Sequence, residues 1–262
     1  MRSVLATAIA TLLLLSACQP ADDSASGSPS GPAVVDSAIA THGGDLLDQA
    51  VVSFHFRGDQ YRLRHNEGRF HYRRTYTDSL ERTVRDGLTN EGVYRVVAGD
   101  TVSLSDEERG SVRTTVNSVS YFALLPYPLQ DPAVQPEYQG RDTLDGTPYH
   151  RVQVTFQQEG GGQDWQDVFV YWFRTDTYAM EYLSYAFGLA PDDTDTGTRF
   201  REAYNVRRIN GVRVADYLNY TSDTLSTDRM HLYPQLRAND ALELVSRVEI
   251  DSVQIRPLPS DT

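Results

Sequence analysis

Lysine is absent from this chain of 262 residues, so all 24 residues counted as Lys+Arg are arginines, against 36 acidic residues. The formal net charge is −12 at pH 7. It becomes −13 once Arg2 is removed with the first 17 residues, which contain no acidic residue. Binding to a phosphate backbone requires a basic surface, which this composition does not supply. We therefore expect no nucleic acid partner.

Cysteine is almost absent as well, because Cys18 is the single one in the chain. A protein with one cysteine cannot be held together by an internal disulfide, so its fold must depend on a hydrophobic core. The chain also lacks a long hydrophobic run. Residues 4–15 are apolar, but a permanent transmembrane helix needs about 20 such residues.

The N-terminus combines Arg2, the short apolar run and the sequence Leu15-Ser16-Ala17-Cys18. This ending resembles the lipobox of bacterial lipoproteins. The resemblance implies that residues 1–17 are a signal peptide and that Cys18 receives lipid, including acyl chains such as palmitate. An ordinary secretory peptide cleaved near Ala17 is the alternative. We expect an anchored protein of the cell envelope, in the outer membrane, and leave open whether it faces the periplasm or the cell surface.

Residues 18–32 are rich in Ser, Gly, Pro, Asp and Ala and contain no large apolar residue. Such a segment cannot bury enough surface to fold, so it predicts a flexible tether. Residues 33–258 are then expected to form a single domain, since all-β domains commonly reach about 200–250 residues. We expect this domain to be a monomer.

Apolar residues recur at helical spacing after Pro32, and the pattern stops at His42-Gly43-Gly44, which predicts a short N-terminal helix. Strands are predicted wherever apolar and polar residues alternate between turn sequences. These strands cover 51–57, 61–64, 70–73, 80–88, 94–97, 102–104, 149–156, 168–173, 180–187, 198–204, 212–220 and 242–255.

Between residues 107 and 129 the apolar period changes, and Pro126 and Pro128 follow, which predicts a central helix and a proline-bounded loop. About ten strands in up-and-down order with two helices leave few architectures. We predict a mainly β, α+β fold: a strongly curved antiparallel meander sheet or open half-barrel, with both helices over its concave face.

This layout resembles the LolA/LppX-type lipoprotein fold. Four segments also resemble an uncharacterised family of Bacteroidota-type envelope lipoproteins, a domain of unknown function covering nearly all of residues 33–255. They are His42-Gly43-Gly44, residues 117–119 with 121–126, Glu159-Gly160-Gly161-Gly162, and residues 198–205. The LolA likeness implies binding of a hydrophobic ligand, such as a lipid or an acyl chain, without chemistry.

We expect the ligand to meet aromatic and apolar side chains of the sheet and of the central helix, together with two arginines. These candidates are Phe54, Phe56, Tyr72, Val119, Phe122, Leu125, Phe169, Tyr171, Phe173, Tyr185, Arg199 and Arg201. The same apolar side chains would also serve a plain filled core. Arg199 and Arg201 share one strand face, opposite Glu202, and could clamp a carboxylate or phosphate group. Pairing with surface acids is the commoner role of such arginines, and we favour it.

Catalytic motifs are missing: the chain has no Gly-x-Ser-x-Gly, no His-Glu-x-x-His and no Ser-x-x-Lys sequence. His42 lies at a helix end, where a protonated imidazole would complement the helix dipole. Alternation puts His65 on the face opposite to His55 and His71, so the three should not converge on a metal ion. We expect neither cofactor nor metal. A hydrolase would require His42, Arg201, Glu202 and Asp216 to meet in one cleft, and a structural lipoprotein without a ligand is the other alternative.

Overall fold

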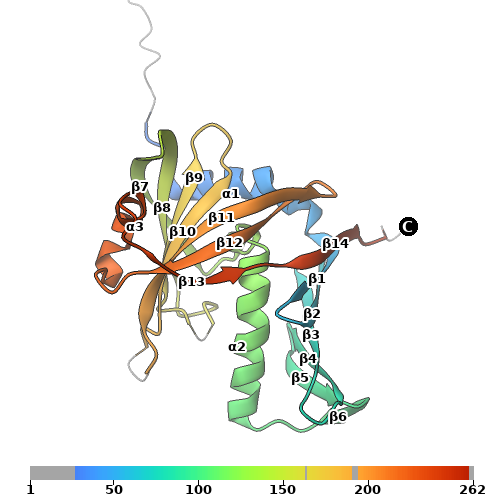
Figure 1. The fold of residues 1–262 in the computed structure, drawn as a ribbon. Coiled ribbons are helices and arrows are strands. Elements are labelled where there is room, and N and C mark those ends of the chain that lie inside the picture. The colour runs from blue at the N-terminus through green and yellow to red at the C-terminus, as the bar shows by residue number, and fades with distance from the viewer. Residues whose placement is uncertain (1–26, 163, 191–193, 260–262) are drawn as a thin grey trace, which may run out of the picture.

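The computed structural model describes residues 27–162, 164–190 and 194–259 (Figure 1). Its strands form two antiparallel sheets of seven strands each. Sheet A has the order β14-β1-β2-β3-β4-β5-β6 and consists of β14 (Asp251–Pro257), β1 (Gln49–Phe56), β2 (Asp59–Asn66), β3 (Arg69–Thr77), β4 (Thr83–Thr89), β5 (Gly92–Val97) and β6 (Asp100–Val102). Sheet B has the order β13-β12-β11-β10-β9-β8-β7 and consists of β13 (Glu243–Val248), β12 (Val212–Thr221), β11 (Gly197–Ile209), β10 (Met180–Phe187), β9 (Val168–Arg174), β8 (Thr147–Phe156) and β7 (Val134–Leu144).

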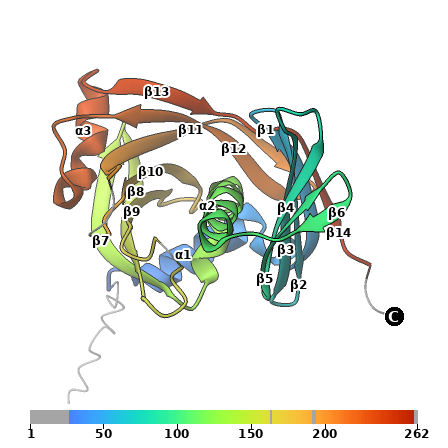
Figure 2. The same cartoon turned by 90° about the horizontal axis from the view of Figure 1, so that it is seen from below.

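The two sheets are joined where the chain passes from β13 to β14 across Glu249 and Ile250. Figure 1 shows these strands running on from one another along the molecule. Seen from below, sheet B curves widely and sheet A stands opposite its far end, with helix α2 (Asp106–Ala123) between them (Figure 2). The predicted fold class, a curved mainly β architecture that forms an open half-barrel with helices on its inner side, is confirmed.

Helix α1 (Gly31–His42) begins at Ser30, whose hydroxyl accepts a hydrogen bond from the Ala33 amide, and it carries Pro32 in its first turn. It ends at Gly43, which adopts the left-handed conformation with φ of 82°. A Cβ at Gly43 would lie 2.8 Å from the carbonyl oxygen of Gly211, so a glycine is required there for space as well as for conformation. The helix thereby packs against β7, β8 and β12.

Helix α2 starts with a capping box in which Ser105 and Glu108 each bind the backbone of the other. Its buried residues include Val112 and Val116, which form a small core with Leu88 of sheet A. The predicted central helix is thus confirmed, and the proline-bounded segment predicted after it contains the short 3-10 helix η2 (Tyr127–Gln130).

The outer face of sheet B carries a second core that the sequence did not predict. A short helical unit, η3 (Thr227–Leu232) followed by α3 (Tyr233–Ala238), covers this face. Met230 and Tyr233 from this unit pack against Trp172, Tyr182 and Phe200. Sheet B is therefore buried on both faces over part of its area, which explains its aromatic content.

Three details of the predicted strands were wrong. Strand β7 was missed, because Pro136 and Gly140 interrupt its alternation and its register shifts between Tyr138 and Gly140. The single strand predicted at 242–255 is two strands that belong to different sheets. The expected single meander is consequently two sheets.

Candidate functional site: a cleft beside helix α2

An open cleft with a volume of about 590 Å³ lies between α2 and the concave face of sheet B. We call it the α2 cleft. Its wall on the helix comes from Asn117, Ser118, Tyr121 and Phe122, with Leu125 beyond the helix end. Its wall on the sheet comes from Phe169, Leu183, Tyr185, Phe187, Arg199 and Arg201, and the loops add Gly161, Gly162, Asp164, Asp167, Gly188 and Asp195.

A second hollow of about 520 Å³ borders the other side of the helix, between α2, sheet A and η2. Tyr72 of β3 and Tyr127 of η2 line this hollow. The two spaces share part of their walls, including Asn117, Tyr121 and Gly161. One hollow therefore lies between α2 and sheet B, and the other lies between α2 and sheet A.

The aromatic wall of the α2 cleft is built by Phe169, which stacks on Tyr171 and Tyr185 with ring centroids 5.9 and 5.5 Å apart. Tyr121 of the helix and Phe156 at the end of β8 contact the same ring. This arrangement follows from cross-strand pairing, since Tyr185 faces Phe169 in the register of β10 and β9. Phe169, Tyr185, Tyr121 and Phe156 are partly exposed and line the cleft, whereas Tyr171 is buried.

Two arginines of β11 lie beside this aromatic surface. The guanidinium of Arg201 lies between the rings of Phe122 and Tyr185, 5.2 and 5.0 Å from their centroids, and it donates a hydrogen bond to the Tyr185 hydroxyl at 3.1 Å. Arg199 lies over Phe187 and donates to the Thr198 carbonyl and the Thr221 hydroxyl. Among the described residues the contacts of both arginines are with aromatic rings, hydroxyls and a backbone carbonyl, and the favoured pairing with surface acids stays a prediction.

The predicted ligand-binding residues divide into two groups. Phe122, Leu125, Phe169, Tyr185, Arg199 and Arg201 line the α2 cleft, and Tyr72 lines the second hollow. Phe54, Phe56, Val119, Tyr171 and Phe173 belong to the buried core instead and line neither space. Alternation along the strands placed the strand residues among them on one face, and the packing of the other elements decides which of them stay accessible.

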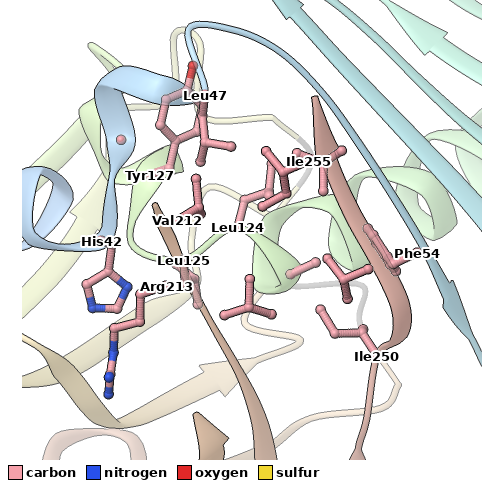
Figure 3. A pocket seen from close by; sticks show the side chains of 15 residues that line it. His42, Leu47, Phe54, Leu124, Leu125, Tyr127, Val212, Arg213, Ile250 and Ile255 are labelled. Atoms are coloured by element: carbon pink, nitrogen blue, oxygen red, sulfur yellow. The ribbon is translucent and has the colours of Figure 1, made fainter. Parts of the chain in front are cut away.

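The space between the end of α2, β1, β12 and β14 is filled by side chains. Figure 3 shows Phe54, Leu124, Val212 and Ile255 pointing into it from different elements, and the room left among them is only about 10 Å³. This is too small for more than a single water molecule. A ligand can therefore occupy the open sides of the helix but not the region beneath its C-terminal end.

His42 is one of the residues around this filled core, at the end of α1 (Figure 3). Its Nε2 accepts a hydrogen bond from the backbone N–H of Met180 at 3.0 Å. Burial first, and then the charges of Arg213 and Arg208, lower its pKa from 6.5 to about 3. The imidazole is therefore neutral at physiological pH, and the predicted role as a protonated partner of the helix dipole is wrong.

The other three predicted histidines lie in different surroundings. His65 is buried beside Tyr72, with 2.7 Å between its Nε2 and the Tyr72 hydroxyl, and burial lowers its pKa to about 4. His71 lies 2.6 Å from the hydroxyl of Tyr94, and His55 lies 3.6 Å from a carboxylate oxygen of Asp251.

The four residues that a hydrolase would require are also dispersed. Glu202 forms a salt bridge with Arg237 of α3 on the outer face of sheet B. Asp216 binds Arg207, Asn205 and the Ile250 amide. Because His42 and Arg201 lie in two further environments, these residues do not form one cleft.

The sequence did not identify several residues of the cleft, among them Asn117, Ser118, Leu183 and Gly161. Gly161 belongs to the Glu159–Gly162 segment, where a Cβ would overlap the carbonyl oxygen of Gln157. The run of glycines could have predicted this part of the wall, because glycines permit a loop to pack tightly there. Three of the four segments that carry the family resemblance border this cleft.

The predicted lipid anchor, Cys18, lies outside the described residues, as does most of the predicted tether. Among the described residues, none of the helices combines the length and apolar character that a membrane crossing demands.

A comparison with solved structures finds several similar proteins. The chain is similar to a LolA superfamily protein from Nitrosomonas europaea, with 11% identity, 88% of this chain and 96% of the other covered, and a TM-score of 0.48. It is also similar to a DUF1329 family protein from Desulfovibrio piger, with 11% identity, 86% and 92% covered, and a TM-score of 0.36. The lipoprotein LppX from Mycobacterium tuberculosis follows with 15% identity, 60% and 89% covered, and a TM-score of 0.27.

No curated protein matches the sequence. The profile of one protein family does match it, over residues 14–250, which is most of the chain and includes every element that lines the α2 cleft. The predicted resemblance to an uncharacterised family is thereby confirmed. The chain belongs to the family of unknown function DUF6503.

Proposed function

We propose that this protein is a lipid-anchored protein of the cell envelope that holds a hydrophobic ligand, a lipid or an acyl chain, in the α2 cleft. The observation that carries the proposal is an open, aromatic-walled cleft of about 590 Å³ beside a solid core. Small-molecule sites are typically about 300–1,000 Å³ in volume and mostly apolar. Phe122, Phe169 and Tyr185 supply the apolar contact area.

Exposure of this apolar wall supports binding over a purely structural role. Aromatic rings that served only the core would be covered, as Tyr171 and Phe173 are. Phe122, Phe169 and Tyr185 are only partly buried, and they border one continuous hollow. A contiguous exposed apolar surface of this kind marks a binding site more often than it marks a neutral surface.

The anchor is proposed from the sequence at Cys18 and its preceding Leu15-Ser16-Ala17. A lipid on Cys18 and the short segment between it and α1 would keep the cleft close to a membrane. Such a location suits a protein whose ligand is itself a membrane component.

Lipid extraction from the purified protein, followed by mass spectrometry, tests this function. The protein is expressed from its full-length chain, and Ser118→Trp fills the cleft from α2, where Ser118 is exposed and lines the wall. Ser111→Trp is the matched control, because Ser111 is exposed on the same helix but lines neither hollow. We expect stoichiometric lipid with the wild type and Ser111→Trp and a clear loss with Ser118→Trp. Absence of lipid from all three would favour a structural role.

A further inference from the structure

The side chains on the concave face of sheet B are apolar and aromatic on some strands and polar on others. On β9 and β10 the side chains of this face are Phe169, Tyr171, Leu183 and Tyr185. On β11, β12 and β13 the strip that continues the same rows is polar and consists of Arg199, Arg201, Asn219, Thr221, Ser246 and, at the outer edge on β13, Glu243. The face that borders the cleft is therefore amphipathic across the strands.

The register aligns this polar strip directly with the aromatic wall. Arg201 is the cross-strand partner of Leu183 on one side and of Asn219 on the other, and Asn219 in turn faces Ser246. Antiparallel partners project to the same side of a sheet, so these side chains share the concave face. A ligand in contact with both halves must itself have an apolar and a polar part.

Arg201 is the charged centre of the strip. Its Nε is buried and has no hydrogen-bond partner among the described residues, and its one described side-chain hydrogen bond is to Tyr185. A guanidinium has five N–H donors in a planar fork, so most of its capacity is unused. The two rings attract the guanidinium by cation–π interaction, but they supply no acceptor for its N–H groups, and a partly buried donor without an acceptor is costly.

Asn219 carries a second unused polar group on the same face. Its amide nitrogen donates to the Ser246 hydroxyl at 3.2 Å, while its Oδ1 is buried without a partner among the described residues. A donor at Arg201 and an acceptor at its cross-strand neighbour are thus both unsatisfied. Of these two residues only Arg201 lines the cleft and is in reach of a ligand there.

We propose that the ligand of the α2 cleft is an anionic amphiphile whose carboxylate or phosphate group binds Arg201 while its hydrocarbon chain lies on the aromatic wall. This inference rests on the proposed function and names the class of its ligand. Planar, bidentate pairing with Arg favours both anions. Arg199, which lines the cleft two residues away on the same face, adds a second positive charge.

Three carboxylates also line the cleft, but they come from loops. Asp164 and Asp167 belong to the connection between β8 and β9, and Asp195 belongs to that between β10 and β11. Arg199 and Arg201 are the cationic residues among the described lining of this cleft. Repulsion from the loop carboxylates directs an anionic head towards the sheet and its arginines.

Four probes with the same 16-carbon chain test the inference by equilibrium binding to the protein expressed from its full-length chain. They are palmitate, hexadecyl phosphate, hexadecanol and hexadecyltrimethylammonium. We expect at least one of the two anions to bind about tenfold or more tightly than hexadecanol, and the cation to bind most weakly. The comparison of palmitate with hexadecyl phosphate distinguishes a fatty-acid head from a phospholipid-type head.

Substitutions of Arg201 test whether this residue causes the preference for an anion over hexadecanol. Arg201→Gln should reduce the preference for the anion over hexadecanol by about tenfold, and Arg201→Lys should retain part of it, because charge remains but the planar fork is lost. Arg85→Gln, an exposed position on β4 remote from the lining, should bind as the wild type does. Thermal unfolding of each variant shows that it is folded.

The results distinguish failure of the anionic-ligand inference from failure of the proposed function. Equal binding of hexadecanol and both anions, or an anion preference unchanged in Arg201→Gln, overturns the inference and leaves the proposed function intact. Failure of all four probes to bind overturns both.

Discussion

Met180 donates its backbone N–H to Nε2 of His42 at 3.0 Å, which joins the end of α1 to the first residue of β10. The acceptor must be a neutral imidazole, and burial with the charges of Arg213 and Arg208 holds the pKa of His42 at about 3. His65, on β2, is also buried and neutral, with a pKa of about 4. Both side chains therefore resist protonation in the folded protein.

Stability should fall as the pH is lowered from 7 to 4. The unfolded chain protonates these histidines near pH 6.5 while the folded protein does not, so the unfolded state binds more protons in this window and gains stability. Each histidine contributes a slope of about 1.4 kcal/mol per pH unit between its unfolded and folded pKa values. Urea unfolding at several pH values measures the total slope.

His42→Gln isolates the contribution of His42, because glutamine can still accept the Met180 hydrogen bond and does not titrate. The variant should lose stability less steeply than the wild type between pH 6.5 and 4. Parallel curves for the two proteins would show that His42 is readily protonated in the folded state.

The ion pair between Asp86 and Arg95 should be important for sheet A. Asp86 is 1% exposed, and both of its oxygens accept hydrogen bonds from Arg95, at 2.6 and 3.0 Å. Asp86→Ala leaves a guanidinium without its partner and should lower the free energy of unfolding by about 3–5 kcal/mol. The double variant Asp86→Leu with Arg95→Met should lose much less, since both charges are removed. Equal losses in urea unfolding would contradict this account.

Gly43 should tolerate alanine poorly for two reasons. Alanine in the left-handed conformation costs about 1–2 kcal/mol, and its Cβ would also approach the Gly211 carbonyl. Gly58 is the matched control, because its φ of 88° is similar but a Cβ added there would meet no atom within 4 Å. Gly43→Ala should therefore destabilise more than Gly58→Ala in thermal unfolding, and the reverse order would refute the packing argument.

Patterns along the sequence predicted the elements well, for physical reasons visible in single strands. In β1 the residues Val52, Phe54 and Phe56 alternate with more polar ones, and all three are buried. The glycine at 43 marked the end of α1 equally clearly. These signals are local, so they do not depend on how distant parts of the chain pack.

Features that depend on distant elements were not predictable. Phe54 on β1 and Tyr185 on β10 are both aromatic residues on strands, yet Phe54 belongs to the core and Tyr185 lines the cleft, because the packing of distant elements decides which ring is covered. Arg201 was expected to pair with an acid on grounds of composition. Composition does not specify that its strand neighbours on that face are Leu183 and Asn219.

Lipid attachment at Cys18 remains a prediction from the sequence. Cells grown with radiolabelled palmitate should label the wild-type protein and leave Cys18→Ser unlabelled, and the variant should keep its signal peptide. The chain has one cysteine, so a thioester at another position cannot mimic this result. Equal labelling of both proteins would exclude the anchor.

Photo-crosslinking with a 16-carbon fatty acid that carries a diazirine along its chain tests directly whether a hydrophobic ligand occupies the α2 cleft. We expect labelled peptides from α2 and from β9 and β10, containing Phe122, Phe169 and Tyr185, and loss of this labelling in Ser118→Trp but not in Ser111→Trp. Labelling confined to the η3 and α3 surface, or unaffected by Ser118→Trp, would contradict it.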